Sequence, residues 1–163
     1  PTQTNTIYQN AFSLENSDLV FENNTIYFSN NKNEFFSIDA RTGTVKWVQS
    51  INSSLRPTII ENLIFTVSNE GYLFIIDDPT GNIVRITDVL KNFKDKLKIK
   101  PIGFIHAKNK VYVSLSNGTL VTINSSTGIQ ENLTKINNSK ISRPYILNNS
   151  MYLIKDNALT KIE

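Results

Sequence analysis

The segment "FFSIDARTGTVKW", from Phe35 to Trp47, consists of two runs rich in β-branched and aromatic residues, separated by a Thr-Gly turn. The same pattern returns as "LFIIDDPTGNIVR" at residues 73–85 and as "LVTINSSTGIQEN" at residues 120–132. Glycine tolerates the positive φ angle that a short hairpin loop requires, and an Asp or Asn that opens such a turn accepts a backbone hydrogen bond. Three equivalent β-hairpins are therefore predicted.

Seven residues mark the repeat and are expected to have structural roles. Each copy has an Asp or Asn four residues before a glycine, and the first copy adds a tryptophan four residues after it: Asp39, Gly43, Trp47, Asp77, Gly81, Asn124 and Gly128. An aromatic residue stands twelve residues before each Asp or Asn, which leaves room for two strands and a second hairpin. We expect Trp47 to pack against a neighbouring repeat rather than to stack on a ligand.

The repeats predict an all-β fold. A period of about 40 residues with four short strands in each unit is typical of the blades of a β-propeller. About four antiparallel, four-stranded blades are predicted, at residues 17–54, 55–99, 100–140 and 141–163. The last copy stops after its third strand, and residues 5–14 are predicted to form an outer strand that completes a blade where a ring closes.

Two segments carry a resemblance to known propellers. The segment "ARTGTVKW", residues 40–47, resembles the quinoprotein-type (PQQ-like) propeller repeat, although Arg85 and Asn132 replace the tryptophan in the other copies. The segment "RPTIIENLIFTVSNEGYLFIID", residues 56–77, is similar to the BamB family, the propeller lipoproteins of the outer-membrane β-barrel assembly machinery. The resemblance runs from about Ser17 to Glu163 and implies that this chain is the C-terminal half of an eight-bladed ring.

The resemblance also implies a function. A BamB-like protein is expected to be a non-catalytic periplasmic scaffold at the outer membrane, held there by a lipid anchor that this sequence does not carry. It would bind the barrel assembly protein and aid the insertion of outer-membrane β-barrel proteins. No motif for partner contacts is found, so no partner-binding residue is transferred to this chain.

Two alternatives stay open: a quinone-dependent dehydrogenase-like propeller, and a generic exported propeller that binds a ligand such as carbohydrate. The dehydrogenases hold quinone beside a disulfide between adjacent cysteines, and this sequence has no cysteine. We therefore expect no catalytic residue, no cofactor and no metal, and we expect structural roles for Asp77, Asp78 and the single histidine, His106. The net charge of +3 is too small to indicate a nucleic-acid partner.

One segment departs from the repeat. The stretch "TDVLKNFKDKLKIKP", residues 87–101, contains five lysines that are candidates for a partner contact: Lys91, Lys94, Lys96, Lys98 and Lys100. Val89, Leu90, Phe93 and Leu97 lie at roughly helical spacing and predict a short amphipathic turn. The segment is either a solvated loop or a basic contact for an acidic partner or anionic lipid headgroups.

Half of a propeller ring leaves apolar faces and strand edges open at its two ends. We therefore expect the isolated chain to form a homodimer of half-propellers, to close into a smaller ring, or to have these faces covered only by neighbours in a crystal.

Overall fold

The computed structural model describes residues 16–162, which form three four-stranded antiparallel sheets and one three-stranded sheet. The first sheet contains β1 (Val20–Glu22), β2 (Thr25–Ser29), β3 (Phe35–Asp39) and β4 (Val45–Gln49). The second contains β5 (Thr58–Ile60), β6 (Leu63–Val67), β7 (Tyr72–Asp77) and β8 (Ile83–Asp88). The third contains β9 (Pro101–Ala107), β10 (Lys110–Leu115), β11 (Thr119–Asn124) and β12 (Gln130–Lys135). The fourth contains β13 (Tyr145–Leu147), β14 (Ser150–Lys155) and β15 (Ala158–Ile162).

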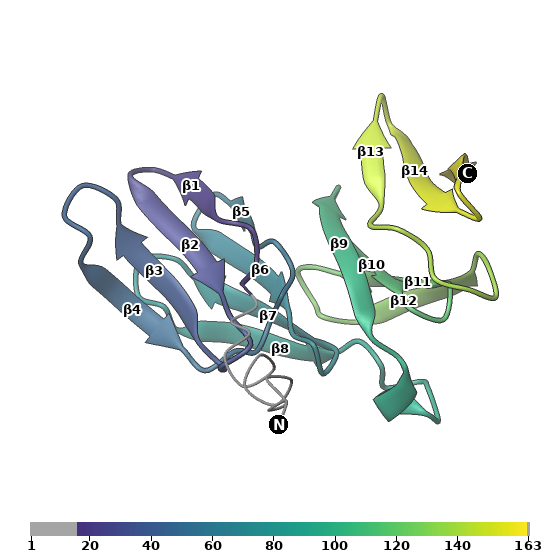
Figure 1. The fold of residues 1–163 in the computed structure, drawn as a ribbon, viewed down its shortest axis with the longest axis horizontal. Helices are drawn as coiled ribbons and strands as arrows, with labels where there is room; N and C mark the ends of the chain where they lie inside the picture. Colours follow the sequence, from purple (N-terminus) through teal and green to yellow (C-terminus); the bar gives the residue numbers. More distant parts are fainter. Residues whose placement is uncertain (1–15, 163) are drawn as a thin grey trace, which may run out of the picture.

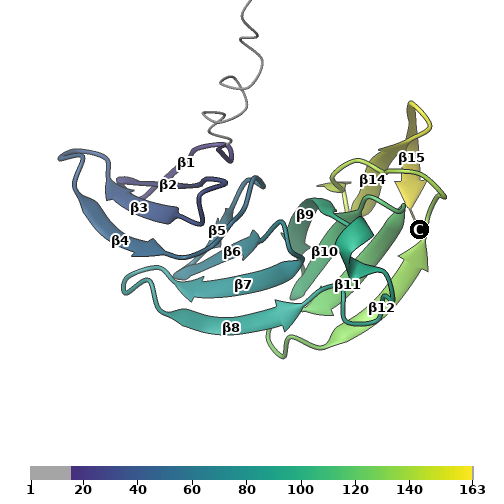
Figure 2. The ribbon, with the colours of Figure 1, turned by 60° about the horizontal axis from the view of Figure 1, so that its bottom comes forward.

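The sheets follow one another in chain order around an open arc (Figure 1; Figure 2). In each of the first three, the first strand lies on the concave side of the arc and the fourth on the convex side (Figure 2). The predicted all-β propeller fold is confirmed, and the last sheet has three strands in its described part, as the repeat indicates. The outer strand predicted at residues 5–14 lies outside the described residues.

Tight turns connect the strands because asparagine and glycine occupy the positions that need positive φ. The β1–β2 connection places Asn23 and Asn24 at φ angles of 47° and 61°, and the β13–β14 connection places Asn148 and Asn149 at 50° and 61°. Two successive residues with positive φ define the turn whose twist matches that of the flanking strands. The abundance of asparagine in the sequence thus has a conformational cause in part.

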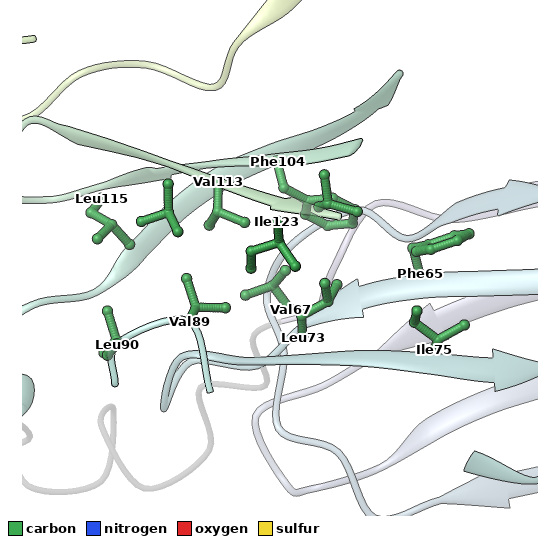
Figure 3. Close-up of a cluster of buried hydrophobic side chains, with 12 residues drawn as sticks. Phe65, Val67, Leu73, Ile75, Val89, Leu90, Phe104, Val113, Leu115 and Ile123 are labelled. Atoms are coloured by element: carbon green, nitrogen blue, oxygen red, sulfur yellow. The ribbon is translucent and has the colours of Figure 1, made fainter. Parts of the chain in front are cut away.

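Two apolar clusters hold neighbouring sheets together. The larger one joins the second and third sheets, and Figure 3 shows Phe104, Val113 and Ile123 of the third sheet pointing toward Val67 and Leu73 of the second. The smaller one joins the first and second sheets around Tyr27, Phe35, Ile51, Ile64 and Ile76. Between the third and fourth sheets the described residues instead line a cavity of about 540 Å³. Packing is therefore tightest in the middle of the arc.

The first sheet has an apolar face directed away from the second. Strand register places its residues opposite one another on that face: Phe21, Ile26, Phe28, Phe36, Ile38, Val45 and Val48. Phe28 and Phe36 stack with their ring centroids 5.1 Å apart, and Phe21 is 66% exposed. The equivalent residues of the second sheet, such as Ile64 and Ile76, are buried under the first. This face is of the kind expected at the end of a half-ring, and dimerisation or ring closure remains a prediction.

A short turn forms in the segment after β8, as predicted, but the prediction that its apolar residues share one face is wrong. The only helical element in the described part of this segment is η1 (Lys96–Lys98), a single 3-10 turn. Val89 and Leu90 are buried in the cluster between the second and third sheets, whereas Leu97 is 98% exposed. The four apolar residues therefore do not share one face, because the first two continue the blade packing before the turn begins.

Candidate binding surface

The Thr-Gly turns are built alike in the first three sheets. The Asp39 carboxylate accepts hydrogen bonds from the backbone N–H groups of Arg41 and Thr42, at 3.0 and 2.8 Å, and the Thr42 bond is the main reason why the pKa of Asp39 is lowered. The Asn124 side chain accepts the equivalent pair of bonds at 3.0 Å. Asp77 accepts one from the backbone of Thr80 at 3.2 Å. The side-chain oxygens of Asp39, Asp77 and Asn124 are therefore used to stabilise their own turns, which argues against a role in binding a ligand.

Two of the three turn glycines, Gly81 and Gly128, lie where one sheet contacts the preceding one. Gly43, Gly81 and Gly128 have φ angles of 72°, 74° and 74°. Trp47 lies against Gly81, where a Cβ atom would be 2.6 Å from the indole Cγ, and its Nε1 donates a hydrogen bond to the Asp78 carbonyl at 2.7 Å. Its ring also stacks on Phe35, at a centroid distance of 5.9 Å. Trp47 therefore joins the first two sheets.

Arg85 has the corresponding position in the second sheet. Its guanidinium donates to the carbonyls of Ser125 and Ser126 at 3.2 and 2.5 Å, and its Cδ lies 2.7 Å from the position of a Cβ atom at Gly128. Asn132 has this position in the third sheet, where it lines the cavity that faces the fourth sheet. The docking position thus changes from Trp to Arg to Asn along the chain, and only the Asn of the third sheet faces a cavity instead of the turn of the next sheet.

Tyr27 makes a further polar contact between the first two sheets. Its hydroxyl donates to the Asp78 carboxylate at 2.6 Å, and its side chain is buried. Burial is the main reason why the pKa of Tyr27 rises above its usual value of 10.0, and the bond to Asp78 raises it further. Of the adjacent acidic pair, Asp78 thus supports sheet docking and Asp77 supports a turn.

Tyr27→Phe is expected to lower the free energy of unfolding by about 2 kcal/mol near neutral pH, because it removes a hydrogen bond to a charged group. The folded protein holds the Tyr27 proton more tightly than the unfolded chain does. Its contribution is therefore complete below pH 10.0 and is lost as the pH rises through the higher pKa of the folded state. Urea unfolding of both proteins from about pH 8 to 11 should show the difference shrinking above pH 10. A constant difference would refute the assignment.

His106 is a packing residue in this structure. Its ring lies 4.8 Å from that of Phe65, across the junction of the second and third sheets, and burial lowers its pKa. It lies on β9 opposite Val111, which belongs to the buried cluster. Across residues 16–162, no group of three or more His, Cys, Asp or Glu side chains is arranged to hold a metal ion.

The outer strands offer free edges on the convex side of the arc. β4, β8 and β12 each end their sheet in the described structure, and each pairs with its inner neighbour through a register shift. β8 is the most apolar of them at the surface, since Val84 and Ile86 are 55% and 53% exposed. Such an edge can accept a further strand, and the bulge near Val84 limits how long the added pairing can be.

The cavity between the third and fourth sheets is the second open feature. Its wall in the third sheet is polar and contains an ion pair of 2.9 Å between Lys110 and Glu131, while its opposite wall is formed by Ile146, Met151 and Ile162. The mutual hydrogen bond raises the pKa of Lys110 and lowers that of Glu131. β15 borders the cavity and is the edge strand of its sheet within the described residues.

The five lysines of the predicted contact segment are all exposed and follow β8. Lys96 pairs with Asp88 at 2.6 Å. No ion pair is present for Lys91, Lys94, Lys98 or Lys100 among the residues that the structure describes. The segment therefore presents four unpaired ammonium groups, next to the free edge of β8.

Two features of this surface are not predicted from the sequence: the apolar edge of β8 and the cavity. The first had a visible signal, because "IVRIT" continues its apolar pattern into the outermost strand, where the third repeat has the polar "QENLTK". The second had a weaker one, the replacement of tryptophan by Asn132. None of the helices in the described part of the chain is long and apolar enough to span a membrane.

The family model described as outer membrane protein assembly factor BamB matches residues 1–87. No curated protein matches the chain. Among solved structures, BamB from Moraxella catarrhalis is similar with a TM-score of 0.71 and 14% identity, over 89% of this chain and 41% of that one. This chain therefore spans about two fifths of that BamB.

Two further structures share the fold. The computationally designed Ika4 protein has a TM-score of 0.72 at 13% identity, over 92% of this chain and 90% of that one. A quinohemoprotein alcohol dehydrogenase from Comamonas testosteroni has a TM-score of 0.61 at 16% identity, over 72% of this chain and 20% of that one. At these identities the likeness shows a common fold and says nothing about activity.

Proposed function

Since this chain belongs to the family of the outer membrane protein assembly factor BamB, we propose that it is a non-catalytic, protein-binding scaffold in outer-membrane protein assembly. The family match over residues 1–87 is the observation that carries the proposal. We expect the protein to work in the periplasm beside the outer membrane. Its expected partners are the barrel assembly protein and the β-barrel chains that the barrel assembly protein inserts into the membrane.

The mechanism we propose is strand addition at the convex side of the arc. A client segment in extended form adds to the free edge of β8 and gains backbone hydrogen bonds, while the exposed side chains of Val84 and Ile86 supply apolar contacts. The bulge beside Val84 keeps the added ladder short. A short ladder favours release, which a factor that passes its client onward requires.

A photo-crosslinking amino acid at Val84 tests this in cells that contain the whole natural protein. We expect crosslinks to the barrel assembly protein or to immature outer-membrane β-barrel chains. The same amino acid at Lys108, an exposed turn residue, is the control position and should give at least tenfold less product. Crosslinks to unrelated proteins only would contradict the proposal, and so would quinone-dependent dye reduction by the purified protein.

Val84→Lys should reduce capture of such an extended segment about tenfold, because a lysine at a free edge opposes strand addition. Leu147→Lys is the matched control, since Leu147 is 63% exposed on β13, an edge strand of a different sheet. Both variants should unfold within about 0.5 kcal/mol of the parent protein, as exposed substitutions usually do. Equal loss of binding in the two variants would show that β8 is not the contact.

A further inference from the structure

The segment between β8 and β9 is a firmly anchored protrusion. Val89 and Leu90 are buried at its start, and Phe93 and Ile99 pack against the same apolar cluster further along. At its end the Lys100 carbonyl accepts a hydrogen bond from the Ser116 backbone at 2.8 Å. Figure 1 shows the short turn of η1 standing beyond the sheets, below β9. Anchors on both sides thus hold the residues between them in a fixed position.

The tip of this protrusion is apolar. Leu97 lies in the middle of η1 and is 98% exposed, which is the highest value among the large apolar side chains in the described structure. Within η1, the backbone N–H of Lys98 donates to the Asp95 carbonyl at 3.1 Å, which keeps the turn closed. The neighbouring Phe93 and Ile99 pack inward against the apolar cluster. Leu97 points outward although residues on both sides of it contribute to the core.

The charge around the tip is positive. Lys94 and Lys98 are exposed on either side of Leu97, and neither has an ion pair with a residue of the described structure. Lys91 and Lys100 extend the basic region, and Asp88 neutralises Lys96. The exposed Asp95 is the one acidic residue within residues 91–100, so the five lysines leave this stretch with a net positive charge. An exposed apolar side chain can enter the boundary between headgroups and acyl chains, and nearby ammonium groups are attracted to anionic lipids.

We propose that residues 91–100 dock on an anionic lipid bilayer, with Leu97 inserted among the headgroups and the lysines paired with lipid phosphates. The shape favours a bilayer over an acidic protein: a convex tip enters a fluid surface without a preformed pocket, whereas a protein partner would need a cavity to receive Leu97. Lysine stems can lie along the apolar boundary while their ammonium groups stay at the headgroups. This contact is independent of the scaffold function proposed above.

Vesicle sedimentation with the full chain tests the proposal. We expect binding to vesicles of phosphatidylcholine with phosphatidylglycerol, little binding to pure phosphatidylcholine, and weakening as salt shortens the Debye length. Leu97→Ser should weaken binding about tenfold. The double variant Lys94→Gln/Lys98→Gln should weaken it about thirtyfold, at about 1 kcal/mol for each lysine. Matched controls elsewhere in the chain are Leu159→Ser, whose leucine is 73% exposed, and Lys108→Gln/Lys161→Gln, and both should bind like the parent protein.

A fluorescent probe reports directly on insertion. The chain has no cysteine, so Leu97→Cys can be labelled at one site with an environment-sensitive dye. Its emission should shift to shorter wavelength with anionic vesicles and stay unchanged for the same label at Leu159→Cys. The proposal is overturned if the Leu97 label does not respond, or if Leu97→Ser binds vesicles like the parent protein. It is also overturned if polyglutamate binds the protein with the same dependence on Leu97, since an acidic protein would then be the partner.

Discussion

Gly81→Ala is expected to lower the free energy of unfolding by about 3 kcal/mol, because it adds backbone strain and a steric clash with Trp47. Gly81 has a φ of 74°, where an alanine is strained by about 1 kcal/mol. Its new Cβ would also lie 2.6 Å from Cγ and 2.7 Å from Cδ2 of Trp47. Trp47 cannot yield easily, because it stacks on Phe35 and donates to the Asp78 carbonyl. Urea unfolding followed by circular dichroism measures the loss.

Gly43→Ala is the matched control. Gly43 has nearly the same φ, 72°, in the same kind of turn, but no atom lies within 4 Å of the position of its Cβ. Only the conformational strain remains, so a loss of about 1 kcal/mol is expected. The difference between the two variants isolates the contact between sheets. Equal losses would mean that Trp47 moves aside freely and does not fix the distance between the first two sheets.

This pair also shows how far the sequence predicts the fold. Both glycines follow from the repeat, because the turn needs positive φ in every copy. The surroundings of each glycine do not follow from the repeat. The repeat cannot show that Gly43 has open space beside it, whereas Gly81 contacts Trp47. The predicted packing role of Trp47 agrees with its observed contacts, yet its acceptor, the carbonyl of Asp78, is a backbone atom with no signal in the sequence.

The segment after β8 shows the opposite outcome. Its lysines were identified from composition, but helical spacing placed Val89, Leu90 and Leu97 on one face, and the structure separates them. Spacing predicts a shared face only where a helix forms, and here the blade core takes Val89 and Leu90 before η1 begins. Tertiary packing therefore decided which apolar residue became the exposed tip, and local sequence patterns carry no information on that.

Phe104→Ala is expected to have the largest effect of all, about 4 kcal/mol of lost stability. Phe104 is 1% exposed and lies opposite Val113 in the cluster that joins the second and third sheets. Truncating a buried phenylalanine removes its apolar contacts and leaves a cavity that the surrounding side chains fill only in part. Phe21→Ala is the control: Phe21 is 66% exposed on the open face of the first sheet, so its loss should stay below about 1 kcal/mol.

Hydrogen exchange in Phe104→Ala also tests which sheets depend on the buried cluster between the second and third sheets. If the arc is held together in its middle, amide hydrogen exchange in Phe104→Ala should accelerate in β6, β7, β10 and β11, the central strands of the two sheets that share the cluster. Exchange in β14 should change least, because the fourth sheet faces a cavity of about 540 Å³ rather than this cluster. A uniform acceleration through β14 would contradict this, and would mean that the fourth sheet folds as one unit with the others despite its open interface.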